Sequence, residues 1–214
     1  MNAQHDGDTG GVSLIVWMCL IQIIGMTSFM TFQTLLPVFL SEWSLTSSEA
    51  GWLNGVYFAG YVATAGIVMP MTDRMDSKPI YLIFALVTTL SSVLFGMFAD
   101  GVVTATLFRL LAGAGLAGTY MVGLKALTDR VPENMQSRAV AWYTATFSIG
   151  SSVSYLAADW LEPLLGWQMA FMAMGGGSAL SLLMAWVLLK PKPMAVRGRL
   201  LQVPDYRPAV KNRA

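Results

Sequence analysis

The Lys and Arg residues of this 214-residue chain are confined to three short segments, and long apolar stretches separate these segments. Twelve of the thirteen bases lie within residues 74–78, 125–138 and 190–213. The apolar stretches between the basic segments come in pairs, so a chain that crosses a membrane in each stretch returns every basic segment to the same side. Membrane proteins keep Lys and Arg in their short cytoplasmic loops. The pattern therefore predicts a multi-pass membrane protein with its basic loops inside the cell.

Six apolar segments are long enough to cross a bilayer, whose core of roughly 30 Å needs about 20 helical residues. Hydrophobic residues make up 55% of the chain and charged residues 12%, about half the charged share of a soluble domain. The backbone finds no water in the bilayer core, so each segment is expected to be helical. The predicted spans are Val12–Leu40, Ala50–Met71, Pro79–Phe98, Val102–Leu127, Ala139–Ala158 and Trp167–Leu189.

These spans predict an all-α integral membrane protein whose two termini are both cytoplasmic. The predicted domains are an N-terminal tail at residues 1–11, a six-span transmembrane bundle at 12–189 and a basic tail or truncated linker at 190–214. An inverted repeat of three plus three spans is favoured by residues near the second span that recur 90 positions later near the fifth. They are Ser47, Trp52 and Gly60, which return as Ser137, Trp142 and Gly150.

The thirteenth base, Arg109, lies inside the fourth span, roughly 10 Å from its outer end at about 1.5 Å per residue. An arginine at this depth is costly, so its side chain is expected to face protein or water rather than lipid. Gly113 and Tyr120 follow it on the same helical face. Two interpretations remain open: a charged group in a substrate pathway, or a structural arginine that donates to the carbonyls of neighbouring helices.

Polar and aromatic side chains form stripes at helical spacing on several of the predicted spans. Because polar groups avoid lipid, these stripes together favour a hydrated cavity between the helices. The alternative for each Ser is a hydrogen bond to a carbonyl of its own helix. The residues predicted to line a substrate pathway are Gln33 in the first span, Asn54, Tyr57 and Tyr61 in the second, Arg109, Gly113 and Tyr120 in the fourth, and Ser148, Ser151 and Tyr155 in the fifth.

The opposite face of the second span carries a small residue at every fourth position: Gly51, Gly55, Ala59 and Ala63. We call this the small-residue face. Small side chains let two helix backbones approach closely in a membrane. The small-residue face is therefore predicted to pack against another helix.

The connection after the second span carries four charges in the seven residues from 72 to 78. The residues predicted to form a gating loop are Asp73, Arg74, Lys78 and, at the start of the fifth span, Arg138. Their charges would contact helix ends and change partners as the protein moves. An ordinary solvated turn is the alternative.

The composition argues against several other classes of protein. His5 is the only histidine and Cys19 the only cysteine, so the chain offers neither a metal site nor a serine–histidine pair. No enzyme activity, cofactor or bound metal is therefore predicted. Thirteen basic and twelve acidic residues nearly balance, which gives no case for a nucleic acid partner. A passive channel is harder to exclude, although the chain has no repeated charged ring or filter sequence.

Two of these motifs resemble the N-terminal signatures of the major facilitator superfamily. They are the turn Asp73-Arg74-x-x-x-Lys78 after the second span and the sequence Arg109-x-x-x-Gly113-x-Gly115-x-x-Gly118 in the fourth. Arg138 and the pair Gly166-Trp167, which open the fifth and sixth spans, are also placed as in that family. The chain departs from the loop signature at Met69 and Asp76, where the family usually has glycine.

The resemblance implies the N-terminal six-helix half of a secondary active transporter, which moves a small solute by alternating access. Members normally have twelve spans in two halves, with substrate bound between them. The expected partners are thus the lipid bilayer, a small-molecule substrate, and a missing C-terminal half or a second copy. Arg109 would suit an anionic substrate, and the expected location is a plasma membrane, such as the bacterial inner membrane. Two alternatives stay open: a non-transporting structural or assembly subunit, and a half-transporter that acts as a homodimer.

The charge pattern predicts the sidedness of the loops, which cysteine labelling can measure. Asp100 and Glu162 lie in connections without bases and are predicted outside, whereas Lys78 is predicted inside. In Asp100→Cys and Glu162→Cys variants, the new thiol should react with a membrane-impermeant reagent added to intact cells. In a Lys78→Cys variant it should react only after lysis. Labelling of Asp100→Cys from the inside alone would reverse the predicted orientation.

Overall fold

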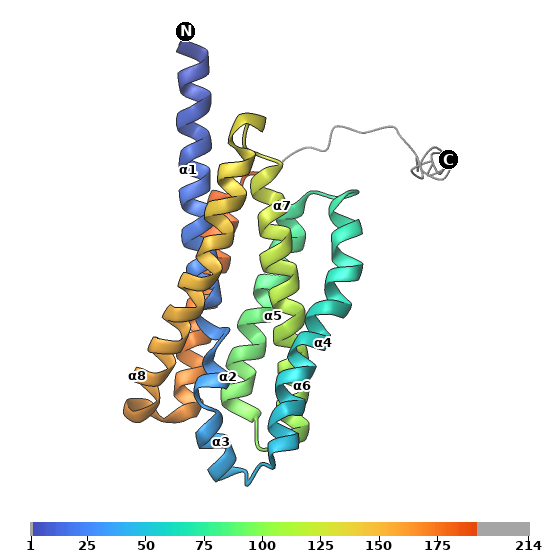
Figure 1. Ribbon diagram of the computed structural model, residues 1–214, viewed down its shortest axis with the longest axis vertical. Helices are drawn as coiled ribbons and strands as arrows, with labels where there is room; N and C mark the ends of the chain where they lie inside the picture. The colour runs from blue at the N-terminus through green and yellow to red at the C-terminus, as the bar shows by residue number, and fades with distance from the viewer. Residues whose placement is uncertain (1, 192–214) are drawn as a thin grey trace, which may run out of the picture.

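Long helices that run side by side form the part of the chain that the computed structural model describes, residues 2–191 (Figure 1). Side chains are described from Gly10 onward, so most of the predicted basic tail at 190–214 lies outside the described residues. Residues 2–191 contain helices and turns but no strand, which confirms the all-α prediction. The elements are α1 (Asn2–Gly25), η1 (Met26–Ser28, a 3₁₀ turn), α2 (Thr31–Thr34), α3 (Leu36–Glu42), α4 (Ser47–Thr72), α5 (Ser77–Phe98), α6 (Val102–Leu116), η2 (Ala117–Met121, a π turn), α7 (Val122–Thr128) and α8 (Glu133–Leu188).

Within the described residues, five helical segments are long and apolar enough to cross a membrane. The fifth, α8, has 56 residues and contains two of the predicted spans, Ala139–Ala158 and Trp167–Leu189. Gly166 interrupts its helical backbone at φ 77° and ψ 162°. Glycine adopts such a positive φ without the steric cost that a Cβ atom brings. Figure 1 shows α8 turning back on itself, so that its two parts run in opposite directions.

The first predicted span, Val12–Leu40, is broken rather than continuous. α1 ends at Gly25, and η1, α2 and α3 continue the chain in short pieces. At the break, the Ser154 hydroxyl accepts a hydrogen bond from the Met30 backbone N–H at 2.9 Å and donates to the Thr27 carbonyl. This hydroxyl replaces partners that an unbroken helix would supply. Irregular backbone can therefore persist inside a membrane bundle at this point.

Capping side chains hold the starts of α4 and α5, and α1 begins at Asn2, ahead of the predicted span. Most of the segment predicted as a tail at 1–11 is therefore helical. At α4 the Glu49 N–H donates to the Thr46 hydroxyl at 3.2 Å, while the Thr46 N–H donates to the Glu49 carboxylate at 2.8 Å. Asp76 caps α5 by accepting from a backbone N–H two residues later at 3.3 Å. These side chains satisfy N–H groups that have no partner within their own helix.

The first two basic segments and Lys190, where the third begins, lie at one end of the bundle, which we call the basic end. Figure 1 shows the α4–α5 connection, the α7–α8 connection and the last turn of α8 at this end. Two ion pairs hold the α4–α5 connection in place: Lys125 Nζ of α7 lies 3.7 Å from the Asp73 carboxylate, and Arg130 of the α7–α8 connection pairs with Asp76. The side of the membrane that the basic end faces stays a prediction.

Two clusters of buried side chains hold the helices together. One lies toward the basic end and packs α1, α5, α7 and α8, with Met18 and Tyr143 among its fully buried members. The other lies toward the opposite end and is strongly aromatic. There the rings of Phe95 and Phe171 stack with centroids 4.2 Å apart, and Trp167 packs edge-on against Phe95. Both parts of α8 are thus anchored to the helices that precede them.

The predicted close packing of the small-residue face is wrong within the described residues, because all four of its members are exposed. A Cβ built at Gly55 would meet no atom within 4 Å. Gly60 makes the close approach instead, since a Cβ there would lie 2.3 Å from the Leu110 carbonyl oxygen of α6. On α6, a Cβ at Gly113 would lie 1.8 Å from the Tyr57 carbonyl oxygen of α4. The backbones of α4 and α6 therefore touch.

Replacing Gly60 by alanine should destabilise the bundle, whereas the same change at Gly55 should not. A methyl group at Gly60 would push α4 away from the Leu110 carbonyl, and overpacking of this kind costs about 1–3 kcal/mol. At Gly55 the methyl group has room, and the higher helix propensity of alanine favours the fold. We expect Gly60→Ala to lower the thermal unfolding midpoint of the purified protein by several degrees, and Gly55→Ala to leave it unchanged or raised. Equal midpoints for the two variants would contradict the backbone contact.

Candidate functional site

Arg109 is buried where α6 meets α4, with a relative exposure of 3%. Its Nε donates to the Leu53 carbonyl at 3.2 Å, and Nη2 lies 3.5 Å from the Asn54 side-chain oxygen. Gly113, one turn further along α6, allows this approach because it leaves room for the α4 backbone. The guanidinium is therefore enclosed by protein rather than lipid, as expected for a charge at this depth.

Two aromatic rings sandwich the Arg109 guanidinium. Its Cζ lies 4.3 Å from the centroid of the Tyr57 ring and 4.6 Å from that of Phe32. With its amide oxygen turned toward Arg109, Gln33 accepts from Nη2 at 3.2 Å while its nitrogen donates to the Phe29 carbonyl at 3.2 Å. Cation–π contacts reach about 2 kcal/mol when they are desolvated. Arg109 thus joins α2, α4 and α6 into what we call the arginine cluster.

A pocket of about 350 Å³ lies between α4, the segment formed by α6 and η2, and the first part of α8. It is separate from the arginine cluster, because Arg109 is not among the residues that line it. Three predicted pathway residues line the pocket: Tyr61, Tyr120 and Ser148. The sequence prediction missed the other four, which are Phe58, Leu116, Thr144 and Phe147. Most of these are apolar, and the sequence gives no signal that separates an apolar lining residue from a lipid-facing one.

The π turn η2 determines how Tyr120 faces the pocket. Gly118 within this turn packs so closely on α5 that a Cβ would lie 2.0 Å from the Phe84 ring. A π turn changes the direction of the side chains that follow it and often occurs at functional sites. The Tyr120 ring meets the Phe147 ring of α8 edge-on, with centroids 5.2 Å apart. The turn therefore directs an aromatic ring of α6–η2 toward α8.

Two further predicted pathway residues join neither the pocket nor the arginine cluster. The Ser151 hydroxyl donates to the Phe147 carbonyl of its own helix at 2.7 Å. This is the hydrogen bond that was the alternative to a place in the pathway. Tyr155 is exposed on the surface of α8. Of the remaining residues, Asn54 and Tyr57 belong to the arginine cluster together with Gln33. The predicted pathway is thus divided between two places in the bundle.

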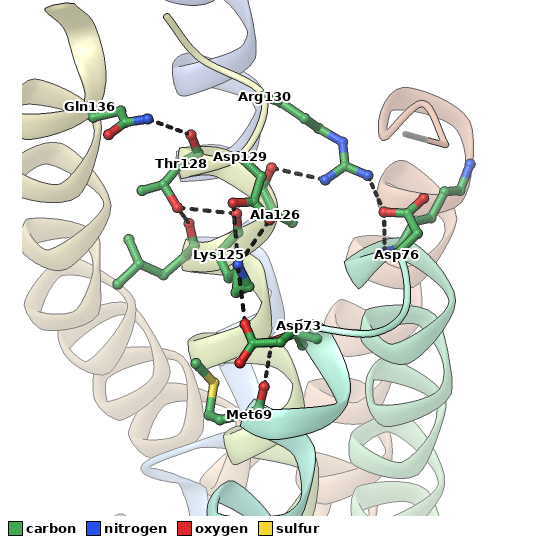
Figure 2. Close-up of polar contacts among 12 residues, drawn as sticks. Met69, Asp73, Asp76, Lys125, Ala126, Thr128, Asp129, Arg130 and Gln136 are labelled. Carbon is green, nitrogen blue, oxygen red and sulfur yellow. Dashed lines mark hydrogen bonds and ion pairs between the residues drawn. The ribbon is translucent and has the colours of Figure 1, made fainter. Parts of the chain in front are cut away.

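Charged side chains pair across the basic end in two groups (Figure 2). In the first group, Lys125 Nζ lies 3.7 Å from the Asp73 carboxylate and 3.2 Å from that of Asp129. The Asp73 side chain is 74% exposed. Ion pairs as exposed as this one contribute little, because water and salt screen them.

The second group is more enclosed and centres on Arg130 (Figure 2). Its guanidinium pairs with the Asp76 carboxylate, and the two side chains are only 9% and 17% exposed. Nη1 donates to the Ala126 carbonyl at 3.1 Å, and Nε donates to the Lys190 carbonyl at 3.2 Å. Charge-assisted hydrogen bonds are the stronger ones in proteins. Arg130 therefore connects the α4–α5 turn with the end of α7 and with the residues after α8.

The predicted gating loop is only partly assembled. Asp73 joins the first charged group, and Lys78 Nζ donates to the Trp186 carbonyl of α8 at 2.8 Å. Arg74 and Arg138 are exposed, and neither pairs with a carboxylate among residues 10–191. The sequence prediction missed four paired residues, although opposite charges in or beside loops at the same predicted end were a signal for them: Asp76, Lys125, Asp129 and Arg130.

Apolar helices around a buried arginine, with a pocket between them and charges gathered at one end, define an integral, multi-pass membrane protein. Residues 18–211 match the family model of the Major Facilitator Superfamily, and the chain belongs to this family. The resemblance drawn from the sequence motifs is thereby confirmed. As in bacterial members of the family, the protein is located in the inner membrane.

The chain is similar to curated transporters from bacteria. The niacin transporter NiaP of Acinetobacter baylyi is 25% identical over 171 residues, which cover 78% of this chain and 38% of that protein. The benzoate transport protein of the same organism is 24% identical, with coverage of 76% and 36%. The hexuronate transporter of Escherichia coli is 26% identical, with coverage of 86% and 42%. The chain thus spans about two fifths of the length of these relatives.

Loss of the Asp76 carboxylate charge should destabilise the protein more than the same loss at Asp73. Asparagine at position 76 can still cap α5 but leaves Arg130 without its counter-charge, at a cost of about 1–3 kcal/mol. The exposed Asp73 pair contributes at most about 1 kcal/mol. We expect Asp76→Asn to lower the thermal unfolding midpoint by several degrees and Asp73→Asn to lower it only slightly. A larger shift for Asp73→Asn would show that the exposed pair is the stronger connection.

Proposed function

We propose that this chain is one half of a secondary transporter that carries a small organic acid across the membrane by alternating access. Family membership and the names of the relatives support transport. The observation that favours an acid is the uncompensated charge of Arg109. Its guanidinium is buried, and among residues 10–191 no carboxylate lies within ion-pair distance of it. In surroundings of low dielectric constant, a positive charge without a counter-charge attracts an anion strongly.

The substrates named for the relatives point to the same class. Niacin, benzoate and hexuronate are all organic acids. The pocket offers the rings of Tyr61 and Phe147 to the body of such a molecule and the hydroxyl of Ser148 to its polar groups. Tyr57 and Tyr61 lie one turn apart on α4, so the arginine cluster and the pocket follow each other along one helix.

The proposed topology has six spans. α8 supplies two of them, because Gly166 divides it into two parts that each contain one predicted span. With an even number of crossings, the chain enters the first span and leaves the sixth at the same end of the bundle, the basic end. The rule that short basic loops stay in the cytoplasm places this end inside the cell.

The face that carries the pocket needs a cover, and we propose a second six-span unit. Thr144 and Ser148 are exposed beside the pocket, and hydroxyl groups are costly against lipid. Rocking of two units about a site at their interface would open the pocket to each side of the membrane in turn. The relatives are more than twice as long as their match to this chain, which leaves room for such a unit. Because the relatives are named as transporters, a non-transporting subunit is not favoured.

Uptake of radiolabelled niacin, benzoate and hexuronate tests this proposal in cells that express the chain together with a second six-span unit; the chain expressed alone should not transport. We expect saturable uptake of at least one of these acids. Arg109→Lys keeps the charge but loses the fork that reaches Leu53 and Asn54 together. Each charged hydrogen bond lost costs about 1.5–3 kcal/mol, so uptake should fall roughly tenfold or more.

Lys190→Arg is the matched control, because the Lys190 side chain is exposed and belongs to neither the predicted pathway nor the predicted gating loop, so its replacement should leave uptake unchanged. Immunoblots of the membrane fraction establish that both variants insert equally. Normal uptake by Arg109→Lys would assign Arg109 to packing alone. Uptake of neutral solutes without any uptake of acids would overturn the proposed substrate class.

A further inference from the structure

A second hollow of about 380 Å³ lies on the outer surface of the bundle, between α5 and the last part of α8. We call it the α5–α8 groove. It lies apart from the pocket and from the arginine cluster, with which it shares no residue. All of its lining side chains are apolar or aromatic: Leu82, Ile83, Leu86, Leu182, Leu183 and Trp186. Ile83, Leu183 and Trp186 are more than half exposed, so the groove opens toward the lipid.

A lysine stands at the end of this groove. Lys78, Leu82 and Leu86 are four residues apart on α5 and therefore share one face of the helix. Lys78 Nζ donates to the Trp186 carbonyl at 2.8 Å, which holds the ammonium group beside the last lining residue of α8. An ammonium group has three N–H donors, so two remain for another ligand. The groove thus combines an apolar channel with a fixed positive charge at its mouth.

The surroundings of Lys78 carry a net positive charge. Asp76, two residues before Lys78, already pairs with Arg130. Arg130 also bonds the carbonyl of Lys190, whose own side chain is exposed at this end. Trp186 is exposed beside the lysine, and tryptophan favours the boundary between hydrocarbon and headgroups. The mouth of the groove therefore lies at headgroup depth in a field that attracts anions.

We propose that the α5–α8 groove is a binding site for one anionic phospholipid. An acyl chain lies between α5 and α8 along Leu82, Leu86 and Leu182, and the phosphate group accepts hydrogen bonds from Lys78. From Lys78 to Leu86 the helix rises about 12 Å, which matches an apolar channel that begins at the headgroups and enters the hydrocarbon. Basic residues at a cytoplasmic groove between spans are typical of sites for anionic headgroups.

Native mass spectrometry of the purified chain, titrated with phosphatidylglycerol or phosphatidylcholine of the same acyl composition, tests the proposal. We expect a first bound phospholipid with a preference for phosphatidylglycerol. Lys78→Gln should lower that preference about fivefold, the effect of one basic residue near an anionic surface. Lys78→Arg should retain it, and so should Arg138→Gln, which removes an exposed base elsewhere at the basic end.

A second variant tests the groove itself. Leu182→Trp fills the channel while leaving Lys78 in place, so it should weaken binding of both phospholipids without removing the preference for the anionic headgroup. An unchanged preference in Lys78→Gln would overturn the headgroup assignment, as would equal binding of the two lipids by the unsubstituted chain. Undiminished binding by Leu182→Trp would place the acyl chain elsewhere. A dimer that Leu182→Trp abolishes would assign the groove to a second copy instead of a lipid.

Discussion

The architecture depends on the lack of water in the bilayer core, which forces each backbone N–H and carbonyl to find its partner within the protein. Along α4 and α5 the helix itself supplies these partners. After α1 the backbone leaves helical geometry, and side chains supply them instead. Ser154 bridges Met30 and Thr27, and the Thr27 hydroxyl donates to the Met174 carbonyl at 3.0 Å. The break is therefore held by both parts of α8, and its position depends on residues more than a hundred positions away.

Charged groups obey the same constraint, but they satisfy it differently at different depths. At the basic end, Arg130 has a carboxylate partner in Asp76, so the pair carries no net charge. Inside the bundle, Arg109 is surrounded by a carbonyl, amides and aromatic rings, which satisfy its hydrogen bonds without neutralising it. Among the described residues it is the only charged side chain so fully buried. The positive charge that remains is the basis of the proposed preference for an anion.

The fold was predictable from the sequence to the extent that it depends on the composition of whole segments. The two predicted spans within α8 fall on opposite sides of Gly166, and the first two basic segments lie at one end as their spacing predicted. Packing faces were not predictable in the same way. Gly55 and Gly60 belong to one helix and are equally small, yet only Gly60 meets α6. When lipid and protein interior are both apolar, periodicity does not determine which small residue faces a neighbour.

The candidate site was predictable residue by residue but not as an arrangement. Arg109 is recognisable in the sequence because a charge at its depth in a span is rare. The direction of the Tyr120 side chain is not, because it depends on a π turn that departs from the regular helical period. A period of 3.6 places residues on a common face only while the helix stays regular, and so the predicted pathway divides into a pocket and an arginine cluster. Among residues 10–191, every buried side-chain nitrogen and oxygen has a hydrogen-bond partner. Around the pocket, by contrast, Thr144 and Ser148 remain exposed on a surface that lipid would otherwise cover. Their requirement for water, a solute or a second helical unit connects this architecture with transport.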